Sequence, residues 1–149
     1  MDDCVACELS DGRRFLPGGL IHRTDHWLVE HCIGPLGLGT LIVKPERHVT
    51  SVADLSYAEA GELGPLLRRA SGVVRESVDA DQVYNCLWSH AAGVPVHIHY
   101  VVQPVTIEQM ALFNAHGPAL QVALFAAGQL PDPAEVDRMA EFARARFAA

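Results

Sequence analysis

The sequence has few basic residues and no long hydrophobic run. Its 149 residues include 11 lysines and arginines against 18 aspartates and glutamates, which gives a formal net charge of −7 at pH 7. A basic stripe that could displace counterions from a phosphate backbone is missing, so we expect no nucleic-acid partner. No apolar run approaches the roughly 20 residues of a membrane-spanning helix. The acidic N-terminus has no signal-peptide core, and we therefore expect a cytoplasmic protein without a membrane partner.

Low-complexity segments and internal repeats are also missing, and 50% of the residues are hydrophobic. This composition indicates a globular chain, and its length suffices for a single domain over residues 1–149. A disulfide framework is not expected in a reducing compartment from the few cysteines present, which are Cys4, Cys7, Cys32 and Cys86. The Cys-x-x-Cys pair near the N-terminus is typical of half of a zinc site, with two incidental thiols as the alternative.

The most informative stretch covers residues 93–104 and reads Gly-Val-Pro-Val-His-Ile-His-Tyr-Val-Val-Gln-Pro. Its β-branched and aromatic residues predict a strand. Because side chains alternate between the two faces of a strand, one face is polar and carries His97, His99, Val101 and Gln103. The other face is apolar and is expected to pack on the core through Val96, Ile98, Tyr100 and Val102. Two imidazoles side by side on a hydrophobic strand indicate chemistry rather than packing alone.

Hydrophobic patterning predicts the other elements. Strands are expected at residues 20–22, 26–31, 40–43 and 83–88. A long helix is expected over residues 54–78, because Ser56 and Glu59 form a capping-box pattern near its start. Two helical segments, residues 107–125 and 133–147, follow the histidine strand, and the first is expected to be interrupted at Gly117-Pro118. Strands, a long helix, more strands and then helices indicate an α+β fold with an antiparallel sheet.

Three connecting segments are also predicted. Residues 1–20 are expected to be irregular, and residues 89–93 to form a turn of small residues. Residues 34–39 contain three glycines and a proline. This composition is typical of a loop that brings backbone close to a ligand, with a plain connection as the alternative.

A zinc site is the first chemistry that the sequence suggests. A closed zinc site takes four ligands from cysteine and histidine. Cys4 and Cys7 provide two of them, and His48 and His97 are placed to provide the others if the N-terminal segment folds over the end of the sheet. A histidine in a surface turn is the alternative for His48. A cupin-like site fits poorly because the nearest downstream glutamate, Glu108, lies beyond the proline, and a barrel metallohydrolase needs a longer chain.

His99 is the candidate nucleophile. An imidazole can attack phosphorus and form a phosphoramidate, which divides one displacement into two easier ones. Its ordinary pKa of about 6.5 leaves the neutral form available near pH 7. One ring nitrogen must attack while the other donates to a fixed acceptor, and a strand supplies that fixed backbone. A hydrogen-bonded core histidine is the alternative interpretation.

The motifs together resemble the histidine triad (HIT) family of nucleotide hydrolases and transferases, in particular its zinc-containing bacterial branch. The resemblance covers about residues 4–104, with a C-terminal helical extension over about residues 105–149. It implies a sheet of about five antiparallel strands with a long helix, usually in a homodimer. The matching motifs are Cys4-x-x-Cys7, the run Gly39–Val49, Ser51–Leu55, Tyr84-Asn85, Ala92-Gly93 and His97-Ile98-His99 leading to Pro104.

The resemblance implies roles for particular residues. Structural zinc would be held by Cys4, Cys7, His48 and His97. His99 would form a covalent nucleotidyl-histidine on a substrate such as a diadenosine polyphosphate or a nucleoside phosphoramidate. The residues expected around the bound nucleotide are Trp27, Glu30, Asn85, Ser89, His90 and Gln103. Leu28, Leu36 and Ile42 are further candidates for the base pocket, with core packing as the alternative for Leu28 and Ile42.

Three departures from the family pattern stand out. Val101 occupies the place of the third histidine, and Gln103 lies on the same face one step further along. Val94 replaces the glutamine that usually follows the glycine. The acidic residue that commonly holds the ribose is replaced near Cys32, where Glu30 is the nearest carboxylate. These departures leave two alternatives to an enzyme: a catalytically weakened, zinc-stabilised nucleotide-binding module, and a structural zinc protein.

Overall fold

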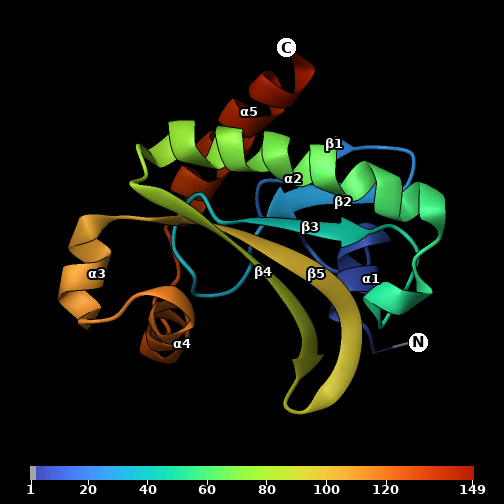
Figure 1. The fold of residues 1–149 in the computed structure, drawn as a ribbon. Coiled ribbons are helices and arrows are strands. Elements are labelled where there is room, and N and C mark those ends of the chain that lie inside the picture. The colour runs from blue at the N-terminus through green and yellow to red at the C-terminus, as the bar shows by residue number, and fades with distance from the viewer. Residues whose placement is uncertain (1–2) are drawn as a thin grey trace.

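A five-stranded antiparallel sheet forms the centre of the protein, and its strand order is β1-β2-β3-β5-β4 (Figure 1). The structure is a computed structural model that describes residues 3–149. The strands are β1 (Leu20–Arg23), β2 (Trp27–His31), β3 (Leu41–Pro45), β4 (Gln82–Ala91) and β5 (Val94–Val105). The predicted α+β fold with an antiparallel sheet is confirmed.

The helices lie around this sheet. They are α1 (Val5–Ser10), the 3-10 helix η1 (Val52–Asp54), α2 (Tyr57–Val78), α3 (Ile107–Phe113), α4 (Gly117–Ala127) and α5 (Pro133–Ala148). Helices α2 and α5 pack on the same face of the sheet, whereas α1 lies on the other side (Figure 1). Within residues 3–149 no single helix is long and apolar enough to cross a membrane, and α3 with α4 meets those criteria only as a pair bent by 72°.

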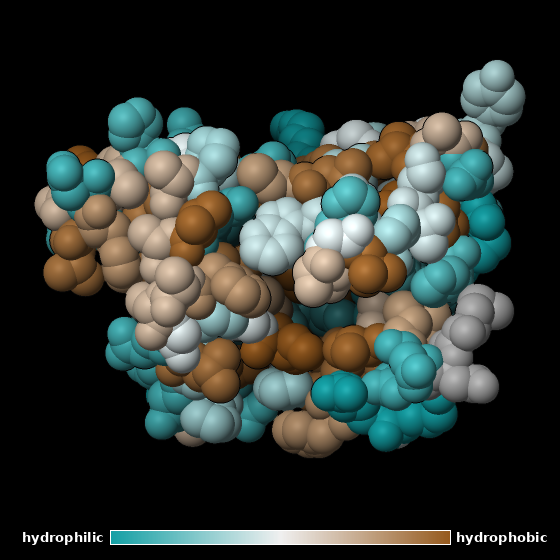
Figure 2. Space-filling view, turned by 90° about the horizontal axis from the view of Figure 1, so that it is seen from below, coloured by the Kyte–Doolittle hydropathy of each residue, from teal (hydrophilic) through white to brown (hydrophobic). Residues whose placement is uncertain are grey.

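Strand alternation divides the buried residues between the two faces. The main core lies under α2 and α5 and includes Trp27, Val29, Val43, Val102 and Ala140. A smaller cluster of Leu36, Ile42 and Val101 lies on the opposite face. Figure 2 looks toward that opposite face, where a hollow is surrounded largely by hydrophobic side chains. The predicted two-sided pattern of β5 therefore agrees with its packing.

Two segments differ from the prediction. Residues 5–10 form α1, whereas an irregular chain was expected; six residues are too few to show a helical period, and Leu9 is the only buried residue among them. Strand β4 continues through Ser89 and His90 to Ala91. The turn is limited to Ala92 and Gly93, with φ values of 50° and 78°. Such positive angles are typical of a tight hairpin that keeps both strands in register up to the turn.

Candidate functional site: a cysteine and histidine cluster beside a cavity

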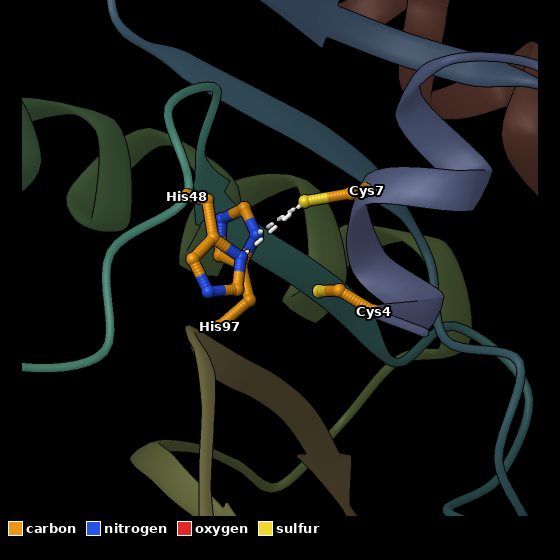
Figure 3. A group of neighbouring side chains, drawn as sticks. All are labelled: Cys4, Cys7, His48 and His97. Atoms are coloured by element: carbon orange, nitrogen blue, oxygen red, sulfur yellow. Dashed lines mark hydrogen bonds between the residues drawn. The ribbon is translucent and has the colours of Figure 1, made fainter. Parts of the chain in front are cut away.

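Four side chains from three parts of the chain meet at one end of the sheet (Figure 3). Cys4 and Cys7 come from the start of α1, His48 from the turn after β3, and His97 from β5. Their donor atoms all lie within 4.8 Å of one another. The Cys7 Sγ atom is 3.4 Å from Nδ1 of His48 and 3.5 Å from Nδ1 of His97. The sequence prediction that these four residues converge is therefore matched by their positions.

The spacing of these donor atoms fits a tetrahedral zinc ion. Bonds of about 2.3 Å to sulfur and about 2.05 Å to nitrogen, at a tetrahedral angle, separate the two ligand atoms by about 3.6 Å. The two sulfur–nitrogen distances at Cys7, 3.4 and 3.5 Å, are close to that value. Two thiols and two imidazoles also form a donor set that zinc prefers. The cluster thus has the donor set and the approximate spacing that zinc requires.

His97 is oriented by the backbone of β3. Its Nε2–H donates to the carbonyl oxygen of Pro45 at 2.7 Å, which leaves Nδ1 unprotonated and directed at Cys7. A second hydrogen bond of this kind commonly fixes the tautomer of a metal-binding histidine. Burial lowers the pKa of His97 to about 4, so the ring is neutral at pH 7. The ring is therefore prepared to act as a ligand.

A cavity of about 370 Å³ opens beside this cluster on the face of the sheet opposite α2. Its walls come from α1, the loop after β2, the strands β2 to β5 and helix α4. Most of the lining is apolar and includes Val5, Leu9, Leu36, Ile42, Val101 and Phe125. The charged side chains in the lining are Glu30, Lys44 and the exposed Asp3. A mainly hydrophobic cavity with a few polar groups is typical of a small-molecule site.

His99 lies in the wall of this cavity. Its Nδ1–H donates to the carbonyl oxygen of His97 at 3.0 Å. Because Nδ1 carries the proton, the lone pair of the neutral ring is on Nε2. Burial lowers the pKa of His99 below its usual 6.5, which keeps the ring neutral at pH 7. This is the arrangement that an imidazole nucleophile requires.

Glu30 and Lys44 form a buried ion pair at the same cavity. Lys44 Nζ is 2.8 Å from Oε1 of Glu30 and donates to the carbonyl oxygen of Ala6 at 2.8 Å. Only 4% of the Glu30 side chain and 1% of the Lys44 side chain are exposed. Burial raises the pKa of Glu30, and Lys44 opposes that rise. Glu30 is among the residues predicted near the nucleotide and Lys44 is not, although a lysine directly after the apolar run Leu41-Ile42-Val43 is an unusual feature of the sequence.

Gln103 lies on the predicted face but is fully buried outside the cavity lining. Its Nε2 donates to the carbonyl oxygen of Leu36 at 3.2 Å. The amide therefore supports the glycine-rich loop, and its position does not bring it to a ligand beside His99. Val101 does line the cavity, together with Leu36 and Ile42, while Leu28 is buried elsewhere.

Ser89 and His90 do not line the cavity either. Both lie near the end of β4, where the register shifts between Trp88 and His90. Trp88 lines the cavity instead, with its ring 6.3 Å from that of His99. Phe125 of α4 adds a wall from the segment outside the family resemblance. Nothing in the sequence indicated that Phe125 lines the cavity, because its position depends on how α4 packs against the sheet.

Trp27 and Asn85 lie on the α2 face, away from the cavity, which corrects their predicted place. Trp27 is fully buried, and its indole N–H donates to the carbonyl oxygen of Glu59 at 2.8 Å. Asn85 lies opposite Val102, and its Nδ2 donates to the Ser71 hydroxyl at 3.0 Å. The physical reason is strand alternation, which directs neither side chain toward the face that carries His99.

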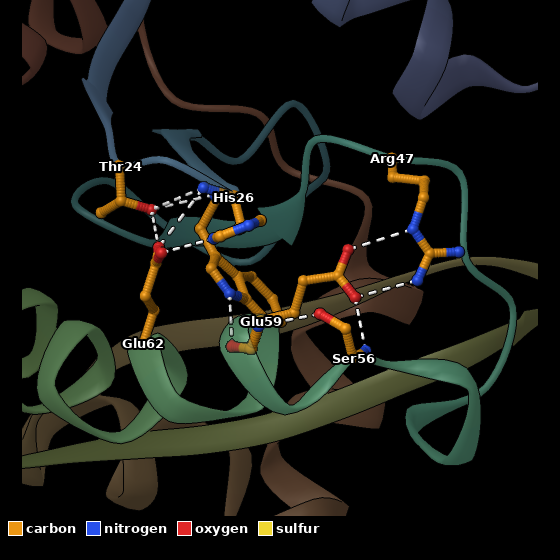
Figure 4. A network of polar contacts seen from close by, with 7 residues as sticks. Thr24, His26, Arg47, Ser56, Glu59 and Glu62 are labelled. Carbon is orange, nitrogen blue, oxygen red and sulfur yellow. Dashed lines mark hydrogen bonds and ion pairs between the residues drawn. The ribbon is translucent and has the colours of Figure 1, made fainter.

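A polar network around Ser56, Glu59 and Arg47 fixes the start of α2 (Figure 4). Trp27 is joined to it by the hydrogen bond to the Glu59 carbonyl. The Ser56 hydroxyl accepts from the Glu59 N–H, and the Glu59 carboxylate accepts from the Ser56 N–H. Arg47 donates to both carboxylate oxygens of Glu59, at 3.0 and 2.9 Å. Arg47 and then the Ser56 N–H lower the pKa of Glu59 to about 2. The predicted capping box is confirmed, and Arg47 ties it to the turn that carries His48.

Replacing Glu59 with alanine is expected to lower the free energy of unfolding by about 1–2 kcal/mol at pH 7, because the capping box and the Arg47 pair are both lost. The folded pKa of Glu59, about 2, lies below its ordinary value of 4.5. The stabilisation is therefore complete above pH 4.5 and is lost as the pH falls toward 2. Urea unfolding at pH 7 and pH 3 checks this. Glu76→Ala, which removes an exposed pair with Arg146, is the matched control and should change stability little.

Comparison with known structures places this arrangement in a known fold. No family model matches the sequence. A zinc-bound histidine triad family protein from Mycobacterium smegmatis is similar, with a TM-score of 0.69 and 20% identity over 99% of this chain and 94% of that one. A hypothetical histidine triad nucleotide-binding protein from Sulfolobus tokodaii has a TM-score of 0.73 and 15% identity over 97% of this chain and 92% of that one. A HIT-like protein involved in cell-cycle regulation from Bartonella henselae has a TM-score of 0.71 and 14% identity over 98% of both chains.

The chain therefore has the fold of the histidine triad proteins, along almost its whole length. The resemblance that the motifs predicted for residues 4–104 is confirmed at the level of the fold, and the structural likeness extends through the C-terminal helices. At these identities the comparison establishes the fold, and function has to be argued from the site itself.

Proposed function

We propose that this protein is a zinc-stabilised nucleotidyl hydrolase or transferase that acts on a nucleotide phosphoanhydride or phosphoramidate. One observation carries the proposal: His99 lies in the cavity wall with its Nδ1–H held by the His97 carbonyl and the lone pair on Nε2. The similar Sulfolobus tokodaii protein, which is named a nucleotide-binding protein, adds support for the ligand class. The family resemblance also supports a homodimer.

The proposed reaction has two displacements at phosphorus. In the first, Nε2 of His99 forms a bond to phosphorus while the bond from phosphorus to the leaving-group oxygen or nitrogen breaks, and the leaving group takes the electron pair. In the second, water adds to phosphorus, and the electrons of the nitrogen–phosphorus bond return to Nε2. The proton lost by water passes through solvent to the leaving group. In a transferase, an acceptor hydroxyl or phosphate replaces water.

Cys4, Cys7, His48 and His97 would hold the zinc. When bound, the metal supplies structural cross-linking rather than activation of the reacting groups. His97 links the two parts of the site, because its ring belongs to the metal cluster and its backbone carbonyl orients His99. Fixing the His97 backbone thus also fixes the carbonyl that holds the Nδ1–H of His99.

A substrate panel tests the proposal. Zinc-loaded protein is incubated with dinucleoside polyphosphates, nucleoside phosphoramidates and nucleotide sugars, and products are separated by chromatography. We expect cleavage of at least one class, and the protein quenched in alkali during turnover should carry a nucleotidyl group on His99 by mass spectrometry. A folded protein that cleaves none of them would contradict the proposal.

A second candidate function is nucleotide binding without turnover. Two observations favour it: Val101 replaces the third histidine, and the only lysine in the cavity lining is already paired with Glu30. Developing charge on the leaving group then has little stabilisation, and each missing donor of this kind costs about 10²- to 10³-fold in rate.

Val101→His is expected to raise turnover about 10-fold or more if the missing imidazole limits the rate. Val101→Leu is the matched control, because it changes the volume of the same side chain without adding a donor. Initial rates on the best substrate of the panel measure the effect. Equal rates for wild type and Val101→His, with both proteins folded, would show that this position does not limit the reaction.

A further inference from the structure

The ion pair between Glu30 and Lys44 stands out because it lies in a mainly apolar cavity. Glu30 is only 3% exposed, yet its Oε2 atom has no hydrogen-bond partner within residues 3–149. Its other oxygen is used by Lys44. A buried carboxylate oxygen without a donor is unfavourable, so native structures usually supply one. Since Glu30 lines the cavity, the missing donor can come from a bound molecule.

The strand register gives the separation between this ion pair and His99. Glu30 pairs with Ile42, and Ile42 pairs with Val101, so Glu30 lies two strands away from β5. Strands are about 4.8 Å apart, which puts the two backbones about 10 Å from each other. Lys44 lies two residues beyond Ile42, in the direction of His99 along the antiparallel pair. Glu30 and His99 therefore line the same cavity from strands that are separated by β3.

The charge at Glu30 restricts what it can meet. A carboxylate accepts hydrogen bonds and repels phosphate oxygens or carbonyl oxygens placed against it. Lys44 holds one carboxylate oxygen and is itself held by the Ala6 carbonyl, so the pair cannot easily turn away. The group that matches Oε2 is therefore an N–H or O–H donor, and an uncharged one suffices because Lys44 already balances the charge of Glu30.

We propose that Glu30, held by Lys44, is a specificity-determining residue that accepts a hydrogen bond from an amino or hydroxyl group of the nucleotide bound beside His99. The inference rests on the proposed function for the position of the nucleotide. The donor is either an amino group of the base or a hydroxyl of the ribose, and both present the same chemistry to Oε2. The site then rejects an otherwise identical nucleotide that lacks the donor.

Glu30→Gln tests this directly, because an amide keeps an oxygen for Lys44 and puts an N–H donor where Oε2 was. Calorimetry measures the affinity of zinc-loaded protein for adenosine, inosine and 2′- and 3′-deoxyadenosine 5′-monophosphates. Adenosine has an amino group where inosine has a carbonyl oxygen. If the base is the donor, the wild-type protein should bind adenosine monophosphate about 10-fold or more tightly than inosine monophosphate. Glu30→Gln should bind inosine monophosphate more tightly instead. If the ribose is the donor, the wild-type protein should bind one of the two deoxyadenosine monophosphates about 10-fold more weakly than adenosine monophosphate. Glu30→Gln should bind that deoxynucleotide and adenosine monophosphate equally well.

Two further variants complete the experiment. Glu46→Gln, in an exposed pair with Arg23, is the matched control and should keep the wild-type preferences. The double variant Glu30→Met with Lys44→Met removes both members of the ion pair, so that no unpaired charge is left buried. It replaces Glu30→Gln in the experiment if that variant is unstable. It should bind all four nucleotides with equal affinity. Equal affinities for all four nucleotides in wild type and in Glu30→Gln would overturn the inference and leave the proposed function intact. No binding of any nucleotide would overturn both.

Discussion

Replacing His99 with alanine is expected to abolish turnover of every substrate that the wild-type protein cleaves, by a factor on the order of 10⁴ or more. The reason is specific to the geometry. In the proposed reaction the His99 ring is the nucleophile of the first displacement, and its Nδ1–H donates to the His97 carbonyl at 3.0 Å. Removing the ring would remove the covalent route, whereas the cavity proposed to hold the nucleotide remains. Initial rates and calorimetry on the same preparations separate the two effects.

The binding measurement decides between the two candidate functions. If His99→Ala binds the nucleotide and loses turnover, His99 acts in chemistry. His116→Ala is the matched control, since His116 is an exposed histidine preceding α4 and is expected to leave the rate unchanged. Unchanged turnover in folded His99→Ala would remove His99 as the nucleophile. Absence of turnover in wild type, with nucleotide binding retained, would favour the binding module.

The alternation rule predicted the two faces of β5 because it needs only neighbouring residues. His97, His99 and Val101 share one face, and Tyr100 and Val102 pack with the core on the other. The same rule assigns residues to the two faces of one strand. It does not say which residues of a neighbouring strand lie on the same face of the sheet. That step needs the register between strands. For this reason Trp27 and Asn85 were expected at the nucleotide and are found on the α2 side.

Contacts between distant residues account for the rest of what the sequence could not predict. Helix α1 is six residues long, and Lys44 of β3 contacts its Ala6 carbonyl. The partnership of Glu30 with Lys44 joins residues 14 apart on neighbouring strands, which only the β2–β3 register reveals. The four proposed zinc ligands could be predicted as a set because Cys4-x-x-Cys7 and His97-x-His99 are chemically distinctive motifs and the family resemblance adds His48. Their convergence depends on the fold and is established only by the structure.

Replacing Cys7 with serine is expected to remove zinc and to lower the melting temperature strongly. Structural zinc contributes on the order of 10 kcal/mol of apparent binding free energy at pH 7, and that energy stabilises only the folded chain. Cys7 contacts both histidines of the cluster, so its loss disrupts the whole set of ligands. Metal analysis should give about one zinc per chain for wild type and none for Cys7→Ser. Cys86→Ser, a partly buried thiol on β4 outside the cluster, is the control and should keep its zinc.

Acidification should release the metal, and the direction follows from the ligands. Burial and the neighbouring Cys4 raise the pKa of Cys7 to about 11, so the free thiol holds its proton at pH 7 and zinc must displace it. Affinity therefore falls as the pH falls, by about 10-fold per pH unit for each thiol that has to lose a proton. Competition with a chelator between pH 8 and pH 6 measures this slope. A slope of zero would mean that the thiols do not bind the metal. A steep slope would show that thiols lose their protons when the metal binds.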